Sequence, residues 1–234
     1  MTTCANIYCS LNQKKKYSDN TYNVQVYALR FFYCYVLKRP RYRLYLPTTK
    51  VSFKLPSILS VQEVERLIKA CDNLKHRTLL MVVYGAGLRI SEALNLKVTD
   101  IDRDRQMLHI RNTKNRRERY VPLSKVLLQA LTDYWQAYRF NDDVFPGSKL
   151  GRPLSQTSVA KLFKAAKKAA EIKKDGGIHS LRHSFAVHTL EAGSDLIAIK
   201  RLLGHRSIHS TVRYCEFSPN YDKRFKSPID ALKL

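Results

Sequence analysis

Hydrophobic residues recur at the three- and four-residue spacing of amphipathic helices along most of the chain. Helix ends are marked as well: Ser60 and Glu63 form a capping box at a helix start, and Gly193 and Gly204 suit the position after a helix end. The predicted helices cover residues 21–37, 60–71, 77–84, 90–94, 125–139, 180–192, 195–203 and 211–216. One more is predicted from an apolar face made of Leu162, Ala165, Ala166, Ala169 and Ile172.

Two short segments break this helical pattern. Residues 107–110 and 119–123 are β-like and flank a polar, basic loop, so they predict an antiparallel hairpin. The predicted fold class is therefore mainly α with a small antiparallel β-sheet (α+β). A basic stretch with three prolines follows the first helix and is typical of a linker. We expect a partial N-terminal helical segment with its linker over residues 1–48, and a main domain with a C-terminal tail over residues 49–234.

The charge balance narrows the choice of partner. The 234 residues include 42 Lys and Arg against 19 Asp and Glu, which gives a formal net charge of +23. Such an excess of positive charge favours a polyanion as the binding partner, and nucleic acid is the commonest polyanion. A basic protein with another role, such as an RNA-binding protein, stays open on charge alone, because charge reports on partners rather than on fold.

Cysteine usage and hydropathy bear on the compartment. The five cysteines are scattered and include no C-x-x-C pair, which argues against a disulfide framework and favours the reducing cytoplasm. The N-terminus shows no signal-peptide pattern, and the most apolar stretch, residues 31–37, is too short to span a bilayer. We therefore expect a cytoplasmic protein with no membrane partner.

Three patches carry candidate chemistry. Arg89 follows a glycine turn in Gly87-Leu88-Arg89-Ile90-Ser91-Glu92. A basic loop over residues 111–119 contains a single acid, Glu118. The third patch is His179-Ser180-Leu181-Arg182-His183, followed by Leu203-Gly204-His205 and then by Tyr214. Because His179 and Arg182 are three residues apart at a predicted helix start, their side chains share a face.

These residue types suit phosphoryl transfer. Arginine can donate two hydrogen bonds to a phosphate, histidine and lysine can move protons, and tyrosine can supply an oxygen nucleophile. A free tyrosine has a pKa near 10, so Tyr214 would need nearby cations. The pair His179 and His183 has a spacing that can bind zinc, but Arg182 between them opposes a dication. We expect no metal and no other cofactor.

The order and spacing of these motifs resemble the catalytic set of the tyrosine recombinases, the family of phage integrases and Xer-type recombinases. The motifs are Gly-Leu-Arg-Ile-Ser-Glu, His-x-x-Arg-His, Leu-Leu-Gly-His and a tyrosine nine residues after that histidine. The resemblance covers roughly residues 58–220. It implies an enzyme that cuts and rejoins DNA through a 3′-phosphotyrosyl link, without metal or ATP. Family members carry a larger N-terminal helical domain, so residues 1–48 would be a shortened version of it.

The resemblance also implies roles for single residues. Arg89 and Arg182 would hold the scissile phosphate, and Lys114 would protonate the leaving 5′-oxygen. His179 would act as general acid and base, His205 would hydrogen-bond the phosphate, and Tyr214 would be the nucleophile. Glu92 would tether the helices of the site, whereas His183 is expected to be structural.

Double-stranded DNA is the expected partner, bound by a homo-oligomer, in this family a tetramer. The expected contacts to the DNA backbone are Arg111, Arg116, Arg117, Lys161, Lys164 and Lys168. The apolar C-terminal end, residues 229–234, would dock on a neighbouring subunit or on its own domain. The rival hypothesis is a truncated, non-catalytic integrase remnant that occupies DNA without recombining it; an intact residue set favours the enzyme.

Overall fold

The computed structural model describes residues 18–40, 46–50, 57–111, 118–147 and 152–218. By its internal contacts the chain divides into two compact units, residues 1–55 and residues 56–234. The predicted domain roles, with a division after residue 48, stay a prediction. No described helix is long and apolar enough to cross a membrane.

The described part of the smaller unit, residues 18–40 and 46–50, is built around helix α2. Helix α2 (Asp19–Phe31) starts at Ser18, whose hydroxyl accepts a hydrogen bond from the Thr21 N–H. It continues as a π-helical turn, η1 (Phe32–Val36). The prediction of a helix over residues 21–37 is therefore confirmed, although its last part is wound more widely than an α-helix.

The following segment packs against α2. Val26 and Tyr22 form a small buried cluster with Leu46. The Asn23 amide donates to the Thr49 carbonyl and accepts from the Thr49 N–H, both at 2.9 Å. This reciprocal pair holds residues 46–50 along the helix.

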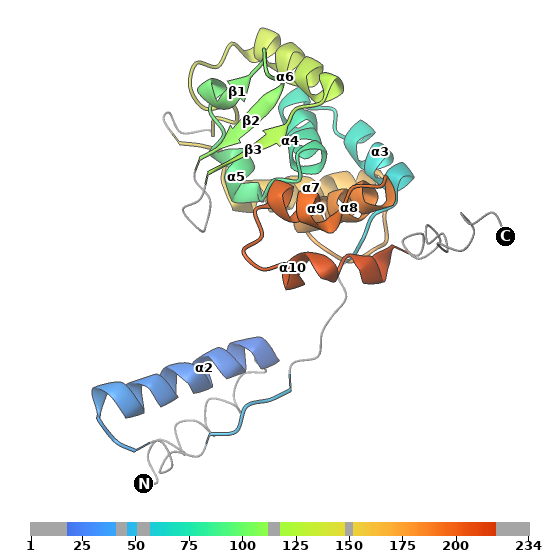
Figure 1. Cartoon of the computed structure of the whole chain (residues 1–234). Helices are drawn as coiled ribbons and strands as arrows, with labels where there is room; N and C mark the ends of the chain where they lie inside the picture. The colour runs from blue at the N-terminus through green and yellow to red at the C-terminus, as the bar shows by residue number, and fades with distance from the viewer. Residues whose placement is uncertain (1–17, 41–45, 51–56, 112–117, 148–151, 219–234) are drawn as a thin grey trace, which may run out of the picture. The chain divides into compact units, whose positions relative to one another are not determined.

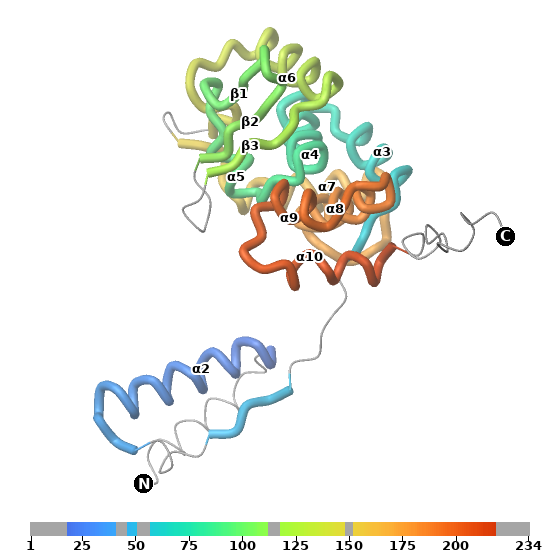
Figure 2. Tube along the Cα trace, viewed as in Figure 1, coloured from blue at the N-terminus to red at the C-terminus, as the bar shows by residue number. Residues whose placement is uncertain are grey.

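In its described residues the larger unit is mostly helical, with one small sheet (Figures 1 and 2). This confirms the predicted fold class. Its elements are α3 (Val61–Lys69), α4 (Leu74–Gly85), α5 (Ile90–Leu94), η3 (Val98–Asp100), β1 (Ile101–Asp102), β2 (Met107–Ile110), β3 (Arg119–Pro122), α6 (Lys125–Tyr138), α7 (Gln156–Ala169), α8 (His179–Glu191), α9 (Leu196–Leu203), α10 (His209–Val212) and η4 (Cys215–Phe217).

The sheet is antiparallel in the order β1-β2-β3. Strands β2 and β3 form the predicted hairpin, in which Leu108 pairs with Val121 and both are buried. The two-residue strand β1 was not predicted, because it is too short to show a period of two. The hairpin loop over residues 112–117 lies outside the described residues.

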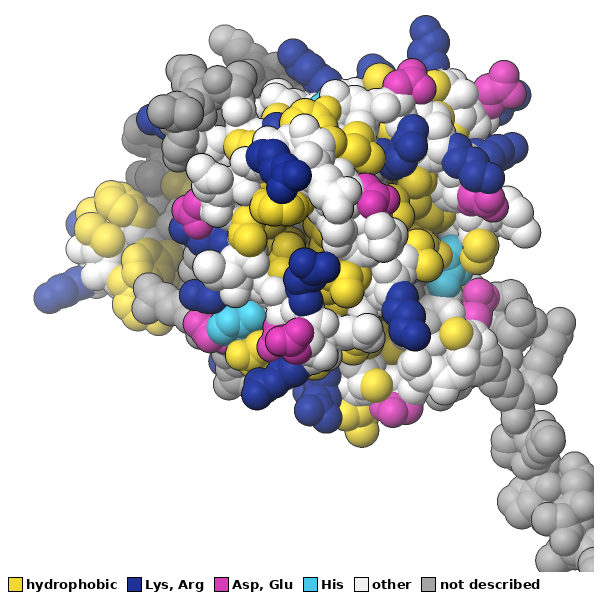
Figure 3. Space-filling model, turned by 90° about the horizontal axis from the view of Figure 1, so that it is seen from above, with side chains coloured by type: hydrophobic (Ala, Val, Ile, Leu, Met, Phe, Trp, Pro, Cys, Tyr) yellow, Lys and Arg dark blue, Asp and Glu magenta, His cyan; other side chains and the backbone are white. Residues whose placement is uncertain are grey.

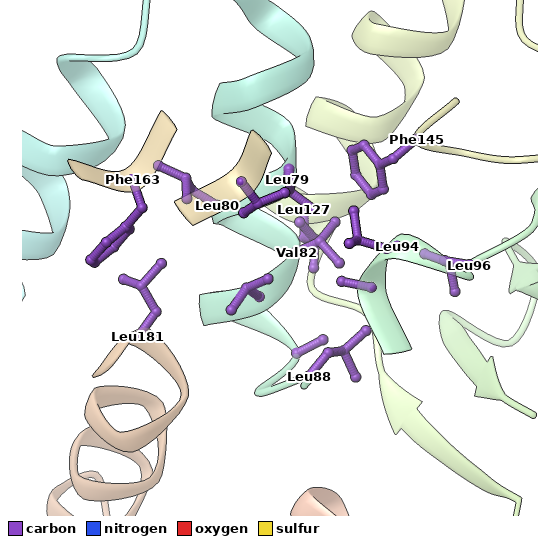
Figure 4. Packing of buried hydrophobic residues seen from close by; sticks show 14 of the residues in the cluster. Leu79, Leu80, Val82, Leu88, Leu94, Leu96, Leu127, Phe145, Phe163 and Leu181 are labelled. Atoms are coloured by element: carbon purple, nitrogen blue, oxygen red, sulfur yellow. The ribbon is translucent and has the colours of Figure 1, made fainter. Parts of the chain in front are cut away.

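Helix α4 lies at the centre of the main core. It packs against both α6 and α8, and it buries Leu79, Leu80, Val82 and Val83. Figure 4 shows Leu79, Leu80 and Val82 in one packed group with Leu127 of α6, Phe163 of α7 and Leu181 of α8. A helix covered on several sides must be apolar around most of its circumference, which is why α4 lacks a clean amphipathic stripe.

Two predictions near the C-terminal half need correction. In α7 the buried residues are Val159, Phe163 and Ala166, whereas Ala165 and Ala169 of the predicted apolar face are exposed. Alanine is small enough to sit on either face of a helix, so it marks a core face poorly. The predicted helix over residues 211–216 is two short helices, α10 and η4, with Tyr214 between them.

A second, smaller cluster lies beside the main core. It joins α8 to α9 through Ala186, Val187, Leu190, Ile199 and Leu203, and Tyr214 is packed into it. Helix α9 contacts both α8 and α10, and η4, which follows α10, contacts α8 (Figure 1). The chemistry-bearing tyrosine is thus part of a hydrophobic cluster.

Candidate active site

A glycine turn sets the position of Arg89. Gly87 has a φ of 59°, in the left-handed region, and a Cβ at this position would lie 2.4 Å from Cδ1 of Phe185. Only glycine fits both the backbone and the space. The chain then enters α5 with Arg89 at the N-cap and its side chain about one-fifth exposed.

The buried carboxylate of Glu92 collects three arginines. Arg89 Nη1 lies 2.8 Å from Oε1, and Arg119 binds both oxygens, at 3.0 and 2.7 Å. Arg182 Nη1 lies 3.6 Å from Oε2. Burial alone would raise the pKa of Glu92, but the hydrogen bonds and charge of Arg119, with the Arg89 N–H and the charge of Arg182, outweigh it and lower the pKa to about 2. Glu92 therefore ties α5, β3 and α8 together, as predicted.

Arg182 is oriented by backbone carbonyls. Its Nη1 donates to the Gly87 carbonyl at 2.8 Å, and its Nη2 donates to the Leu203 carbonyl at 2.5 Å. Burial lowers the pKa of Arg182 to about 10, so it keeps its charge at neutral pH. A guanidinium has five N–H donors, so these two bonds leave others for an anion.

Charge at this cluster does not balance. Three guanidinium groups meet one carboxylate, which leaves two positive charges in a largely buried place. Unbalanced buried charge is costly unless an anion joins it. An arginine-rich cluster of this kind is suited to a phosphate group.

Tyr214 presents its hydroxyl to the same site. The side chain is only 2% exposed, and its Oη lies 3.0 Å from Nδ1 of His183. Burial raises the pKa of Tyr214, while the charges of Arg182, Arg213 and Arg89 act to lower it. The cations that the sequence led us to expect are present, but burial outweighs them in the protein without DNA.

Two more histidines complete the site. His179 is the first residue of α8, and its ring meets that of His183 edge-on at 5.1 Å. His205 follows Gly204, its Nδ1 lies 2.9 Å from Oγ1 of Thr211, and its ring stacks at 6.3 Å from that of Tyr214. Burial, followed by the charges of Arg182 and Arg89, lowers the pKa of both histidines, that of His205 to about 4. Both rings are therefore neutral at physiological pH.

The structure thus brings together five of the six predicted catalytic residues: Arg89, His179, Arg182, His205 and Tyr214. Lys114 lies outside the described residues. Sequence reasoning missed two members of the site, Arg119 and His183. Arg119 was visible only as one of several cations in a basic loop, and His183 was expected to be structural. Its spacing of four residues from His179, on the same helix face, was the available signal.

The predicted DNA contacts divide into two groups. Lys161, Lys164 and Lys168 are exposed on α7 and line an open groove of about 1270 Å³, which extends along residues 171–178 to the start of α8. Arg111 is half exposed and pairs with the buried Asp100 at 2.5 Å. Arg116 and Arg117 lie outside the described residues. In Figure 3, Lys and Arg side chains are spread over one face of the molecule among hydrophobic and neutral groups.

The described histidines of the site are not grouped as metal ligands. Among the described residues, no group of three or more His, Cys, Asp and Glu side chains is arranged to hold a metal ion. The histidines at 179, 183 and 205 instead lie beside arginines, whose charge disfavours a dication.

Comparison with known proteins shows the family to which the chain belongs. Residues 57–220 match the phage integrase family. The chain is 40% identical to y4qK, a protein of Sinorhizobium fredii that is named as an integrase or recombinase, over 95% of this chain and 72% of that one. It is 31% identical to the tyrosine recombinase XerA of Pyrococcus horikoshii, over 95% of this chain and 77% of that one.

A solved structure of another recombinase has a similar fold. The recombinase XerH, in a post-cleavage complex with its difH substrate, superposes with a TM-score of 0.65 and 25% identity. The match covers 73% of this chain and 52% of XerH, so this chain spans about half of that relative. From the residues matched and the identity to XerA, the chain belongs to the phage integrase family, the tyrosine recombinases.

Proposed function

We propose that this protein is a site-specific DNA recombinase that cleaves and rejoins DNA strands through a covalent link between Tyr214 and a 3′-phosphate. One observation carries the proposal: a buried tyrosine hydroxyl shares a site with three arginines that, among the described residues, pair with a single carboxylate, that of Glu92. The arginines suit the phosphate, and the tyrosine supplies the attacking oxygen.

Roles follow from position and from membership of the family. Arg89 and Arg182 bind the phosphate oxygens, with Arg182 held in place by two carbonyls. His179 serves as general acid and base, and neutral His205 donates a hydrogen bond to the phosphate. Lys114 protonates the leaving 5′-oxygen. The energy of the broken phosphodiester is kept in the phosphotyrosine, so no ATP is needed.

Double-stranded DNA reaches the site over a basic surface. The groove lined by Lys161, Lys164 and Lys168 leads to the start of α8, where His179 stands. Exposed lysines beside an open groove fit contacts to successive phosphates. Arg111, Arg116 and Arg117, in and beside the hairpin loop, add contacts next to Lys114.

A covalent trapping experiment tests the proposed function. The protein is incubated, in EDTA and without ATP, with nicked duplexes of randomised sequence. A nick close to the cleavage position lets the short strand with the new 5′-hydroxyl diffuse away, so rejoining is blocked. We expect a protein–DNA adduct that survives denaturation and whose sequencing gives the target. Binding of DNA with no adduct at any sequence would support the non-catalytic remnant, and an adduct that needs magnesium or zinc would contradict the mechanism.

We also propose that the protein works as a tetramer on DNA, by analogy with its family. A duplex carrying two copies of the selected target provides the test. Light scattering should show four chains on the assembled pair of target sites, and recombinant products should form only in that complex. Products formed by a complex with two chains would contradict the tetramer.

Substitution of Arg89 tests phosphate binding with less risk to the fold than substitution of Arg182. The Arg89 guanidinium is partly exposed and pairs with Glu92, whereas that of Arg182 is buried and donates to two backbone carbonyls. We expect Arg89→Ala to lower the single-turnover cleavage rate at saturating protein by about a hundredfold or more, since its charge acts mainly on the transition state.

Arg105→Ala is the matched control, because this arginine pairs with an acid three residues away, Asp102, but is exposed. Its cleavage rate should stay within about twofold of wild type. A change of less than about threefold in Arg89→Ala, below the 1.36 kcal/mol of a tenfold effect, would remove Arg89 from the catalytic set.

A further inference from the structure

His183 lies inside the site, yet the family resemblance gives it no part in the reaction. It follows Arg182 on α8, and its Nδ1 lies 3.0 Å from the hydroxyl oxygen of Tyr214. The two rings are 5.8 Å apart and tilted by 48°. In the described part of the chain, His183 is the hydrogen-bond partner of the attacking oxygen.

The other two histidines of the site, His179 and His205, make their contacts with other groups. Nδ1 of His205 bonds the Thr211 hydroxyl at 2.9 Å, and its ring lies 6.3 Å from that of Tyr214. The ring of His179 meets His183 rather than the tyrosine. Neither is placed as closely to the Tyr214 hydroxyl as His183 is.

Every charged group that faces His183 favours its neutral form. Burial lowers its pKa to about 4, followed by the charges of its neighbours. The titratable and charged groups around it are His179 and Arg182 on α8, His205 after α9, and Arg213 and Tyr214 between α10 and η4. A neutral imidazole with its proton on Nε2 accepts a hydrogen bond at Nδ1.

We propose that His183 holds the Tyr214 hydroxyl in place and takes its proton as the tyrosine attacks. The Oη–H bond breaks and its proton moves to Nδ1 of His183, while Oη forms a bond to phosphorus. The bond from phosphorus to the 5′-oxygen breaks, and that oxygen leaves with a proton from Lys114. On rejoining, His183 returns its proton to Oη. The inference rests on the proposed function and divides its proton transfers between two histidines. His183 serves the tyrosine oxygen, and the acid–base role of His179 is confined to the phosphate oxygens.

The timing of the transfer follows from the resting state. In the protein without DNA the proton stays on Tyr214, because burial raises the pKa of the phenol and lowers that of the imidazole. A bound phosphate adds negative charge beside His183 and makes the imidazole a better base. The nucleophile is thus activated only when its substrate is in the site.

The same helix provides a matched control. Five residues further along α8, Nδ1 of His188 lies 2.8 Å from the hydroxyl of Tyr84. Both pairs join a half-buried histidine of α8 to a tyrosine, but Tyr84 belongs to α4 and has no part in the chemistry. Replacing His188 therefore removes the same kind of bond at a structural position.

The experiment compares adduct formation by wild type, His183→Asn, His183→Gln and His188→Asn from pH 5.5 to 9.5, with the selected nicked duplex. Wild type should show a rate that is nearly constant between pH 6 and 8. The His183 variants should react about a hundredfold or more slowly at pH 7, with DNA affinity within about twofold of wild type. Their rates should rise about tenfold per pH unit, because the tyrosine must then ionise by itself.

His188→Asn should keep the wild-type pH profile. A wild-type profile in either His183 variant would overturn the inference while leaving Tyr214 as nucleophile. A wild-type rate that itself climbs tenfold per pH unit between pH 6 and 8 would overturn it too, even if the variants fail to fold. No adduct from wild type at any pH would instead refute the proposed function, and this inference with it.

Discussion

Replacing Tyr214 with phenylalanine is expected to reduce covalent attachment to DNA by at least about a thousandfold, because the change removes the nucleophilic oxygen. DNA affinity should change little, since the hydroxyl is buried and bonded to His183 rather than exposed to solvent. Loss of that hydrogen bond should lower the free energy of unfolding by about 1 kcal/mol, which urea denaturation measures.

Tyr84→Phe is the matched control for this change. It also removes a hydroxyl that is bonded to a histidine of α8, so it should carry a similar cost in stability and leave the adduct yield unchanged. Tyr221→Phe tests the other tyrosine near the end of the chain, which lies outside the described residues. A stable adduct formed by Tyr214→Phe, or loss of the adduct in Tyr221→Phe, would contradict the assignment of Tyr214 as the nucleophile.

Glu92→Gln should be the most destabilising single change in the site. Its carboxylate is almost fully buried and meets Arg89, Arg119 and Arg182, so neutralising it leaves three guanidinium groups without a counter-charge. Breaking a buried ion pair by removing one partner costs about 3 to 5 kcal/mol. The measurement is the urea midpoint at pH 7, and cleavage by the folded fraction should fall as well, because Glu92 positions both arginines.

The control for Glu92 is Glu65→Gln. Glu65 pairs with Lys69 at 2.6 Å on the outside of α3, where both side chains are more than half exposed. A solvent-exposed pair of this kind adds little to stability, so the urea midpoint of Glu65→Gln should stay close to that of wild type. Equal destabilisation by the two substitutions would show that the buried cluster does not hold the fold together.

The pH dependence of stability gives a second measurement on Glu92. Its pKa falls from an ordinary 4.5 to about 2 in the folded protein, so its contribution is fully present above pH 4.5. That contribution is lost as the pH falls from 4.5 towards 2, where the folded protein takes up the proton. Wild type should therefore lose more stability across this window than Glu92→Gln, and parallel curves would contradict the low pKa.

The sequence by itself determined most of the elements of the larger unit. The capping box at Ser60 placed the start of α3, and the residues before Gly204 placed the end of α9. These signals are local, since a cap or a helix stop depends on residues within one turn of each other. The order of Arg89, His179, Arg182, His205 and Tyr214 could likewise be read from the sequence, because the motifs are short and resemble those of the family.

Only the tertiary structure decided which side chains of the site contact one another. Glu92 meets Arg119 from a strand 27 residues away and Arg182 from a helix 90 residues away, and no periodicity in the sequence joins such positions. The contact between His183 and Tyr214 depends in the same way on how α8 packs beside the segment after α10. Burial also reversed the expected balance at Tyr214, since exposure is set by packing as a whole. Residue types and spacing are local properties of the chain, whereas desolvation and long-range contacts exist only once the chain has folded.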